Sequence, residues 1–394
     1  MEIGLFGGFG EKGRTSLTVR SGRTCLLLDA GIKVGAAGAD YHPRLIWPAS
    51  DIDALLVSHA HEDHVGALAW LSGQGFAGRI LMTAETKSEA PATLAAYAGA
   101  ADLRDRPFPC ERIELFEPGQ TIRIGGMKVE TGRSGHVVGG VWFAVDDGLR
   151  RVVYCGDVVP DSAVFLMDRP PQCDLIVLDA SYGADPVTGV ERTRAIADWL
   201  EAHPGGCLLP TPLSGRSLEL IAALPGRFAV HADMRASLEA QIDAEGALLP
   251  GMPARLRASL EEAADWREDE PLPACPLLAD DGMGQAGPSA RLLPRAAGEG
   301  FPILLTGHLP AGSPGRRLHD GGRAQWIRMP THPTLPGNLA IWKGAGSPAA
   351  LGHSCDPADL EALGTHIPAL LPGARTGQTL TVPGDRRAGT IAKF

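Results

Sequence analysis

Seven apolar stretches of strand length recur along this chain, and each is followed by a polar residue near a small or turn residue. These stretches lead to Asp29, His59, Asp157, Asp179, Thr211, His308 and His353. Segments with helical spacing of apolar residues lie between them, for example residues 191–203. Strands that alternate with helices are typical of α/β folds, which place reactive side chains on loops at strand ends. The pattern therefore predicts an α/β protein with a site along a common sheet edge.

A chain of 394 residues exceeds one ordinary hydrophobic core, so more than one domain is expected. Between residues 183 and 330 the order of helical and strand patterns indicates a separate α/β unit. Within it, residues 253–266 are predicted to be helical. The acidic stretch 265–281, with three of its residues proline, is predicted to be a surface loop.

Composition excludes several classes of protein. No apolar stretch reaches the roughly 18 residues that a membrane span needs, and the N-terminus lacks the pattern of a signal peptide. The 7 cysteines form no CxxC pair, which argues against a zinc ribbon or a disulfide framework and favours reduced thiols in the cytoplasm. A net charge of −10 argues against a generic nucleic-acid binder, although it leaves room for a local basic groove.

Residues 55–66, LLVSHAHEDHVG, concentrate three of the 12 histidines directly after an apolar run. In an extended loop, His59 and His61 can converge on one metal ion from the same side. Asp63 and His64 follow directly, and their different direction suits a second ion beside the first. The alternative is a polar helix N-terminus with Asp63 in its first turn, but that accounts poorly for three histidines.

The sequence HAHEDH after a strand resembles the signature of the metallo-β-lactamase superfamily, and further motifs of that family follow in order. They are Asp29 in LLLDAG, His136 in RSGHVVGG and Asp157 in YCGDVV. The resemblance implies an αββα sandwich that binds two divalent ions, with Zn²⁺ favoured and Mn²⁺ an alternative. It implies that one ion is held by His59, His61 and His136, the other by Asp63, His64 and His353, with Asp157 as the bridge.

Later segments resemble the β-CASP branch of this superfamily, which comprises nucleases that process nucleic acids. The segments are DASYG (179–183), LPTPLSGRSLELI (209–221), LADDGMGQAGPS (278–289) and LLTGHLPAGSPGRRL (304–318). His332 would supply motif B and His353 motif C. This resemblance predicts a metallo-β-lactamase domain made of residues 1–182 and 334–394, with a β-CASP domain inserted over residues 183–333.

The chain departs from the branch pattern at three places. Thr331-His332-Pro333-Thr334 stands where Ser-Ala-His, a small residue and an acid are usual, so the partner that would orient His332 is open. His308 stands where tyrosine is usual, and Ser313 where threonine is usual. The alternative for His332 is a surface histidine flanked by proline.

The implied activity is hydrolysis of phosphodiester bonds in single-stranded RNA, by endo- or 5′-exonuclease action, with water activated between two metal ions. The expected catalytic residues are Asp63, His332, Asp179 and Asp29, of which Asp29 orients the site from behind the ligands. His332 is the candidate donor to the leaving oxygen, and Asp179 could orient it. The alternative is a structural role, in which Asp179 caps a turn and Tyr182 packs against neighbouring residues.

Phosphate contacts are expected from two clusters, each at a predicted helix start. The clusters are Ser214, Gly215 and Arg216, and Ser313, Arg316 and Arg317. For either arginine cluster, a solvated surface is the alternative. The substrate is expected to thread between the two domains, which favours a single strand over a duplex.

The sequence leaves three other functions open. The first is hydrolysis of small esters, lactones or thioesters, which the acidic balance favours slightly. The second is DNA exonuclease action, since nothing in the sequence reads a 2′-hydroxyl. The third is a non-catalytic β-CASP scaffold, against which all seven ligand positions are filled. A homodimer is neither required nor excluded, and no membrane partner is expected.

Overall fold

The structure is a computed structural model that describes residues 1–394 except 99, 107, 225, 310–311, 383–391 and 394. Small parts of the expected 304–318 and 334–394 ranges therefore lie outside the described residues. The chain forms two compact units. The first unit comprises Met1–Pro160, Met167–Pro186 and His332–Phe394, and the second comprises Asp161–Leu166 and Val187–Thr331.

The first unit contains an eight-stranded sheet with the order β20-β19-β1-β2-β3-β4-β5-β6. Its strands are β1 (Glu2–Gly7), β2 (Ser16–Ser21), β3 (Thr24–Leu28), β4 (Ala54–Leu56), β5 (Arg79–Met82), β6 (Ile113–Leu115), β19 (Thr379–Thr381) and β20 (Ala392–Lys393). β3, β4, β5 and β6 run parallel, so their carboxyl ends reach the same edge.

A six-stranded sheet with the order β18-β11-β10-β9-β8-β7 forms the second layer of this unit. Its strands are β7 (Thr121–Ile124), β8 (Met127–Arg133), β9 (Val141–Asp146), β10 (Arg151–Tyr154), β11 (Leu175–Asp179) and β18 (Ala349–His353). β10, β11 and β18 are parallel to one another. The C-terminal strand β18 thus completes a sheet that begins more than 200 residues earlier in the chain.

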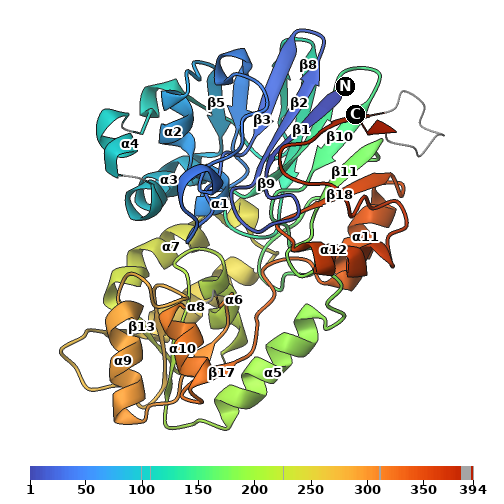
Figure 1. The fold of residues 1–394 in the computed structure, drawn as a ribbon. Coiled ribbons are helices and arrows are strands. Elements are labelled where there is room, and N and C mark those ends of the chain that lie inside the picture. The colour runs from blue at the N-terminus through green and yellow to red at the C-terminus, as the bar shows by residue number, and fades with distance from the viewer. Residues whose placement is uncertain (99, 107, 225, 310–311, 383–391, 394) are drawn as a thin grey trace. The chain divides into compact units, whose positions relative to one another are not determined.

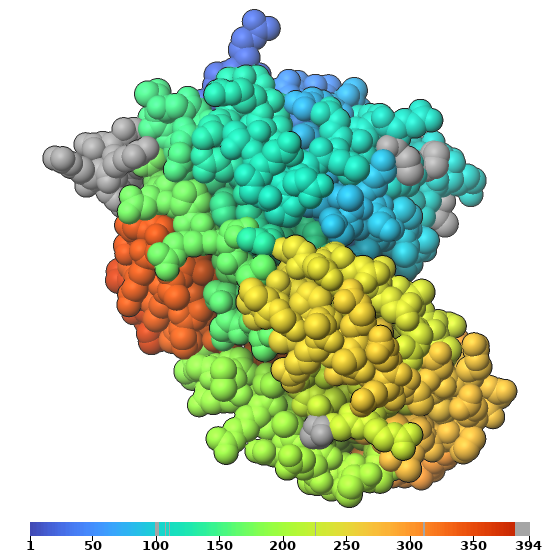
Figure 2. All heavy atoms as spheres, turned by 180° about the vertical axis from the view of Figure 1, so that it is seen from behind, coloured from blue at the N-terminus to red at the C-terminus, as the bar shows by residue number. Residues whose placement is uncertain are grey.

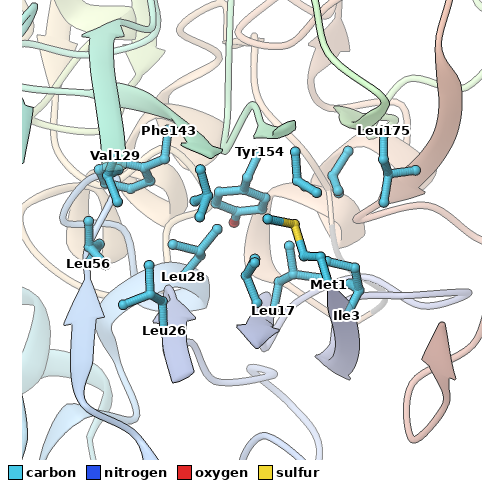
Figure 3. Close-up of a cluster of buried hydrophobic side chains, with 14 of the residues drawn as sticks. Met1, Ile3, Leu17, Leu26, Leu28, Leu56, Val129, Phe143, Tyr154 and Leu175 are labelled. Carbon is cyan, nitrogen blue, oxygen red and sulfur yellow. The ribbon is translucent and has the colours of Figure 1, made fainter. Parts of the chain in front are cut away.

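The two sheets face each other across an apolar core (Figure 3). Leu26 and Leu28 of β3 point into this core, where Phe143 of β9 and Tyr154 of β10 meet them. Successive strand residues point to opposite faces, so Leu27 lies on the outer face of the first sheet. Because both faces are buried, the strands read as continuous apolar runs rather than alternating ones.

Helices cover the outer face of each sheet in the first unit (Figure 1). The helices of this unit are α1 (Glu62–Val65), α2 (Leu68–Gly73), α3 (Ala84–Tyr97), α4 (Ala100–Asp105), α11 (Leu335–Gly344) and α12 (Pro357–Gly364). α2 and α3 pack on the first sheet, and α11 and α12 on the second. In Figure 2 the orange-red surface of the C-terminal helices borders the green surface around β11. The predicted αββα sandwich is confirmed.

The second unit is an α/β unit with a parallel four-stranded sheet in the order β12-β15-β13-β14 and a parallel pair, β16 and β17. The strands are β12 (Cys207–Pro210), β13 (Ala229–His231), β14 (Ala264–Trp266), β15 (Pro276–Ala279), β16 (Leu304–Leu305) and β17 (Gln325–Trp326). The helices are α5 (Gly189–Glu201), α6 (Arg216–Ala223), α7 (Arg235–Asp243), α8 (Met252–Glu262), α9 (Ser289–Glu299) and α10 (Pro314–Asp320).

Three expectations from the sequence need correction. Residues 264–266 form β14 rather than the end of a helix, and the expected surface loop 265–281 contains the buried strand β15. Prolines around residues 271–276 hid β15, yet Pro276 only opens the strand, where its missing N–H is tolerated. The seven apolar stretches do not end in one sheet, because β12 and β16 belong to sheets of the second unit.

In the described part of the chain, none of the helices combines the length and the apolar character that crossing a bilayer demands.

Candidate metal centre

Five strand ends of the first unit supply the candidate site. Asp29 follows β3, the 58–64 loop follows β4, Asp157 follows β10, and Asp179 and His353 end β11 and β18. The register between β11 and β18 pairs Asp179 directly with His353. Parallel pairing therefore brings together residues that are 174 positions apart in sequence.

The loop after β3 is held tightly against the histidine-rich loop after β4. The Ala30 N–H donates to the His64 carbonyl (2.7 Å), and the Ile32 N–H donates to the Glu62 carbonyl (3.0 Å). A Cβ on Gly31 would lie 1.6 Å from the Asp63 backbone oxygen, so only glycine permits this approach. The glycine of LLLDAG is thus explained by the close packing of the two loops.

Four side chains converge on one point. Donor atoms of His59, His61, His136 and Asp157 all lie within 4.8 Å of one another. His61 Nδ1 is 3.2 Å from His136 Nε2, and the Nε2 atoms of His59 and His136 are each 3.7 Å from Asp157 Oδ2. His59, His136 and Asp157 are buried. Three imidazoles and one carboxylate at these distances form a cluster that can hold a divalent metal ion.

Asp29 is buried next to this cluster and accepts several hydrogen bonds. Its carboxylate accepts hydrogen bonds from the Ser58 N–H (2.6 Å), the Tyr154 hydroxyl (2.6 Å) and His64 Nδ1 (2.7 Å). Its backbone has a φ of 60°, which is rare for a residue other than glycine, asparagine or aspartate in a turn. Several donors on one rigid carboxylate fix the orientation of the ring of His64.

The same hydrogen bonds determine which ring nitrogens carry a proton. The Ser58 hydroxyl donates to Asp29 Oδ2 (2.7 Å), so Ser58 Oγ accepts from His59 Nδ1 (3.0 Å). His64 Nδ1 likewise donates to Asp29. In neutral rings, Nε2 of both His59 and His64 then presents a bare lone pair to the cluster.

The buried polar atoms of this cluster suit a bound cation. Among the described residues, His59 Nε2, His64 Nε2 and Asp157 Oδ1 are buried without a hydrogen-bond partner. His64 Nε2 and Asp157 Oδ1 lie 3.1 Å apart. Burial alone would lower the pKa of His64, but the carboxylates of Asp157, Asp63 and Asp29 raise it well above its ordinary value, so this position favours positive charge. Burial lowers the pKa of His59 and His61 well below its ordinary value, which favours the neutral rings that metals bind. This nitrogen and oxygen donor set suits a divalent ion.

The remaining predicted ligands lie beside this cluster. Asp63 Oδ2 is 3.7 Å from His64 Nε2, and the rings of His64 and His353 are 6.2 Å apart. His353 Nε2 donates to the Gly156 carbonyl (3.0 Å), and His353 Nδ1 is 3.0 Å from Ser354 Oγ. The structure thus brings His353 to the site with both ring nitrogens hydrogen-bonded, and its part as a ligand stays a prediction.

His332 has the partner that its own motif lacks. His332 Nδ1 lies 2.9 Å from Asp179 Oδ2, and Asp179 Oδ1 accepts from the Ser181 hydroxyl (2.6 Å). Tyr182 packs edge-on against the His332 ring at 5.1 Å. Burial alone would lower the pKa of His332, but the carboxylates of Asp179 and Asp157 raise it to about 10. Asp179 therefore orients His332, in place of an acid in the sequence that follows it.

The expected phosphate contacts lie in the second unit, where many of their groups bind other parts of that unit. The Gly215 N–H donates to Gln241 Oε1 (3.1 Å), and Arg216 Nη2 donates to Thr331 Oγ1 (3.2 Å). Ser313 Oγ accepts the Arg316 N–H (3.2 Å), and the Arg316 side chain pairs with Asp320 (2.8 Å). Arg317 Nη1 donates to the Gly312 carbonyl. A phosphate role for these clusters, which include Ser214, stays a prediction.

Sequence reasoning missed Ser58 and Tyr154. Both serve Asp29, and both are polar residues within or directly after the apolar runs that lead to His59 and Asp157. It also missed Asn338, whose side chain donates to the Asp179 carbonyl (2.9 Å) from α11. A polar side chain inside an otherwise buried run is the available signal for the first two, whereas nothing local marks Asn338.

Residues 10–249 match the protein family described as "Metallo-beta-lactamase superfamily". Among solved structures, a protein of unknown function from Enterococcus faecalis V583 superposes with a TM-score of 0.60 and 13% identity. The superposition covers 96% of this chain and 99% of that one, and shows a shared fold.

Three curated relatives align with parts of this chain. Ribonuclease TTHA0252 of Thermus thermophilus is 29% identical over 57% of this chain and 54% of its own length. The transcription termination factor FttA of Cenarchaeum symbiosum is 24% identical over 82% of this chain and 58% of its own length. Subunit 3 of the cleavage and polyadenylation specificity factor of Dictyostelium discoideum is 28% identical over 57% of this chain and 32% of its own length. The chain thus spans less than two thirds of the length of these relatives.

Proposed function

Because the chain belongs to the metallo-β-lactamase superfamily, in the β-CASP branch that its motifs resemble, we propose that it is a metal-dependent nuclease that hydrolyses single-stranded RNA. The observation that carries this proposal is the cluster of His59, His61, His136 and Asp157, whose donor atoms lie within 4.8 Å. In this proposal the second unit is the β-CASP domain expected over residues 183–333.

The proposed metal ligands are those that the resemblance implies, with Asp157 shared between two ions. His59, His61 and His136 would hold one ion, and Asp63, His64 and His353 the other. Bound divalent ions, Zn²⁺ by preference for this histidine-rich set, would supply Lewis acidity toward water and the phosphoryl oxygens. Support comes from the unpartnered nitrogens of His59 and His64, which already point to the cluster.

Side chains of the protein would orient the metal ligands and donate a proton to the substrate. Asp29 keeps the Nδ1 proton of His64 in place, so Nε2 stays an acceptor. Asp179 accepts from His332 Nδ1, which leaves His332 Nε2–H to donate to the scissile phosphate or to the leaving 3′ oxygen. The buried carboxylates of Asp157 and Asp179 favour the protonated ring that such a donor needs.

RNA is the preferred polymer because the curated relatives include a protein named as a ribonuclease, a transcription termination factor and a subunit of a cleavage and polyadenylation specificity factor. A single strand leaves its bases unpaired and its phosphate backbone free to follow a binding groove, without the constraint of a double helix. Cleavage inside the chain or from its 5′ end is compatible with this site.

The test is cleavage of 5′-labelled single-stranded RNA and matched DNA, with metal content measured on the same protein. We expect RNA to be cut with Zn²⁺ or Mn²⁺, and about two ions to be bound per chain. His59→Ala and Asp157→Ala should each lower cleavage by about 10³-fold and reduce bound metal. His366→Ala and Asp51→Ala, both at exposed positions, are the matched controls and should change neither.

Intact RNA in the presence of either ion would overturn the proposal. Turnover of thioesters or lactones by the same protein would then identify a hydrolase of small esters. Equal cleavage of DNA would leave the nuclease and remove the preference for RNA.

A further inference from the structure

A cavity of about 500 Å³ in the first unit is lined by three arginines, Arg14, Arg44 and Arg375. It lies where the loop after β1 (residues 8–15), the segment 39–44 and the turn before β19 meet. Arg44 is exposed, so the cavity reaches the surface. A cavity of this size can admit a phosphate group together with part of the nucleotide that carries it.

Strand β1 holds the two segments that carry Arg44 and Arg375. The Arg44 N–H donates to the Phe6 carbonyl (2.7 Å), and the Gly377 N–H donates to the Leu5 carbonyl (2.7 Å). A Cβ on Gly377 would lie 3.0 Å from Arg44 Nη1, so the Arg44 guanidinium lies against the turn that follows Arg375. Neighbouring carbonyls of one strand therefore bring both arginines to the same cavity.

The other charged groups of the cavity pair with one another. Arg14 contacts Glu11 (2.9 Å) and Asp40 (3.2 Å), and Lys33 contacts Glu11 (2.8 Å). Burial alone would raise the pKa of Glu11, but hydrogen bonds from Arg14 and Lys33 lower it. Glu11 is therefore a carboxylate at neutral pH, and these two cations and two anions cancel in charge.

Arg44 and Arg375 add two positive charges to this balanced set. Within the described ranges of the chain, neither guanidinium forms an ion pair. Arg375 Nη1 donates to the carbonyls of Pro372 (2.6 Å) and Ala374 (2.8 Å), which fixes the side chain and leaves Nε and Nη2 as available donors. A guanidinium presents its N–H groups in a planar fork that matches phosphate oxygens. The cavity thus combines surplus positive charge with available donors, in a chain whose net charge is −10.

The loop after β1 also contacts two segments of the candidate metal centre. The Thr15 N–H donates to the Asp63 carbonyl (2.8 Å). The Ser354 N–H, next to His353, donates to the Gly8 carbonyl (2.7 Å). One loop therefore lines the cavity and supports the segments that carry two predicted metal ligands, so a polymer bound at the metal centre has an anion-binding cavity in the same unit.

We propose that Arg44 and Arg375 together bind one backbone phosphate of single-stranded RNA, other than the phosphate that is cleaved. This inference rests on the proposed nuclease function, which supplies the polymer. Two guanidinium groups can donate to different oxygens of one phosphate. The surplus positive charge disfavours a metal ion, and an apolar ligand would use none of the guanidinium donors. The two arginines contribute to substrate binding and leave the chemical step to the metal centre.

The experiment measures the affinity of the metal-free full chain for a labelled single-stranded RNA oligonucleotide over a range of salt concentrations. Arg44→Gln and Arg375→Gln should each weaken binding by about 5-fold at about 0.1 M salt, and the slope of log affinity against log salt should fall by about 0.7. Because both arginines are proposed to bind one phosphate, the double variant should lose less than the product of the two single losses. Losses that multiply would show two independent contacts and overturn the shared site.

The matched control is Arg23→Gln, which makes the same change of charge at an exposed position between β2 and β3 of the same unit. It should leave the affinity and the salt slope nearly unchanged. Arg44 is exposed and unpaired among the described residues, so Arg44→Gln should keep the melting temperature of the wild-type chain. Arg44→Gln therefore tests the site even where Arg375→Gln loosens the turn that Arg375 holds.

Cleavage by the metal-loaded chain separates this site from the nuclease proposal. Arg44→Gln should raise KM for RNA and leave kcat unchanged, whereas a fall in kcat alone would contradict a binding role. Wild-type affinity, salt slope and KM in Arg44→Gln would overturn the site, and cleavage by that variant would leave the nuclease standing. A chain that needs Arg44 to bind RNA but leaves RNA intact would keep the site and remove the nuclease. A wild-type chain that neither binds nor cuts RNA would remove both.

Discussion

The strand ends of the two units carry polar groups of different kinds. Among the described residues beside the site of the first unit, His59 Nε2, His64 Nε2 and Asp157 Oδ1 are buried without a hydrogen-bond partner. In the second unit, Thr211 follows β12 and Thr306 follows β16, and both hydroxyls are buried. Converging nitrogen and oxygen ligand atoms suit a metal ion, whereas a hydroxyl can both donate and accept a hydrogen bond.

This difference shows that the α/β architecture determines where the polar side chains lie, whereas the side chains themselves determine which kind of ligand they can bind. In both units, parallel strands deliver polar residues to the carboxyl edge of a sheet. The first unit adds a buried carboxylate, Asp29, that accepts several donors and so fixes its histidines. In the second unit, the buried Glu219 carboxylate accepts a hydrogen bond from the Ser162 hydroxyl. Four predictions separate the two edges.

Removal of divalent ions has the largest expected effect. Cleavage of RNA should fall by about 10³-fold or more, because charge on the transition state loses its cation. RNA affinity should change much less than cleavage, because the arginines predicted to contact phosphate, Arg216, Arg316 and Arg317, are not among the predicted metal ligands. Cleavage and fluorescence anisotropy on the same chelated sample measure the two effects. Zn²⁺ or Mn²⁺ added back is the control, and undiminished cleavage after verified depletion would contradict the metal centre.

His332→Ala should lower cleavage by about 10²- to 10³-fold, as expected for loss of a positioned proton donor. Metal content and RNA affinity should be retained, since His332 is proposed to bind substrate rather than metal. Asp179→Asn should give a smaller loss, because the ring remains but loses its acceptor at Nδ1. A loss of bound metal in His332→Ala would instead assign His332 to a metal site with Asp157 and Asp179, whose donor atoms lie within 4.8 Å.

Glu219→Gln should stabilise the chain in a pH-dependent way. Burial raises the pKa of Glu219 from 4.5 to about 7, so the folded state disfavours the carboxylate. Stability is therefore lost as pH rises from 4.5 toward 7, and the variant should regain up to about 3 kcal/mol above pH 7 and nothing below pH 4.5. Urea unfolding at pH 5 and pH 8 measures this. Glu261→Gln, at an exposed position of α8, should show no such difference.

The smallest effects concern Asp29 and the groups that donate hydrogen bonds to it. Asp29→Asn should weaken metal affinity by about 10- to 100-fold, because His64 and Ser58 lose their charged acceptor. Tyr154→Phe removes one donor to the same carboxylate and should have a distinctly smaller effect. Competition with a chromophoric chelator ranks the two variants. A metal affinity of Asp29→Asn equal to that of the unchanged chain would show that Asp29 orients no ligand.

Local pattern was sufficient for much of the fold and for the centre of the site. The apolar runs before Asp29, His59 and Asp157 are strands in the structure, because strands that are buried on both faces must be apolar throughout. The histidine-rich loop was recognisable because imidazole and carboxylate groups at such spacing have few other uses. By contrast, β15 escaped detection, since four residues that begin at a proline show no period that distinguishes a buried strand from a loop.

The sequence by itself determined the strand-forming segments and the types of groups at their ends, because apolar periodicity and ligand chemistry are local properties. Only the tertiary structure decided which of these groups meet. The β11–β18 register paired Asp179 with His353, and the fold gave His332 an acceptor from a strand 153 residues earlier. The bridge between Leu208 and Ile303 likewise depends on which strands lie side by side. Long-range pairing depends on the packing of the whole chain, so no single segment encodes it.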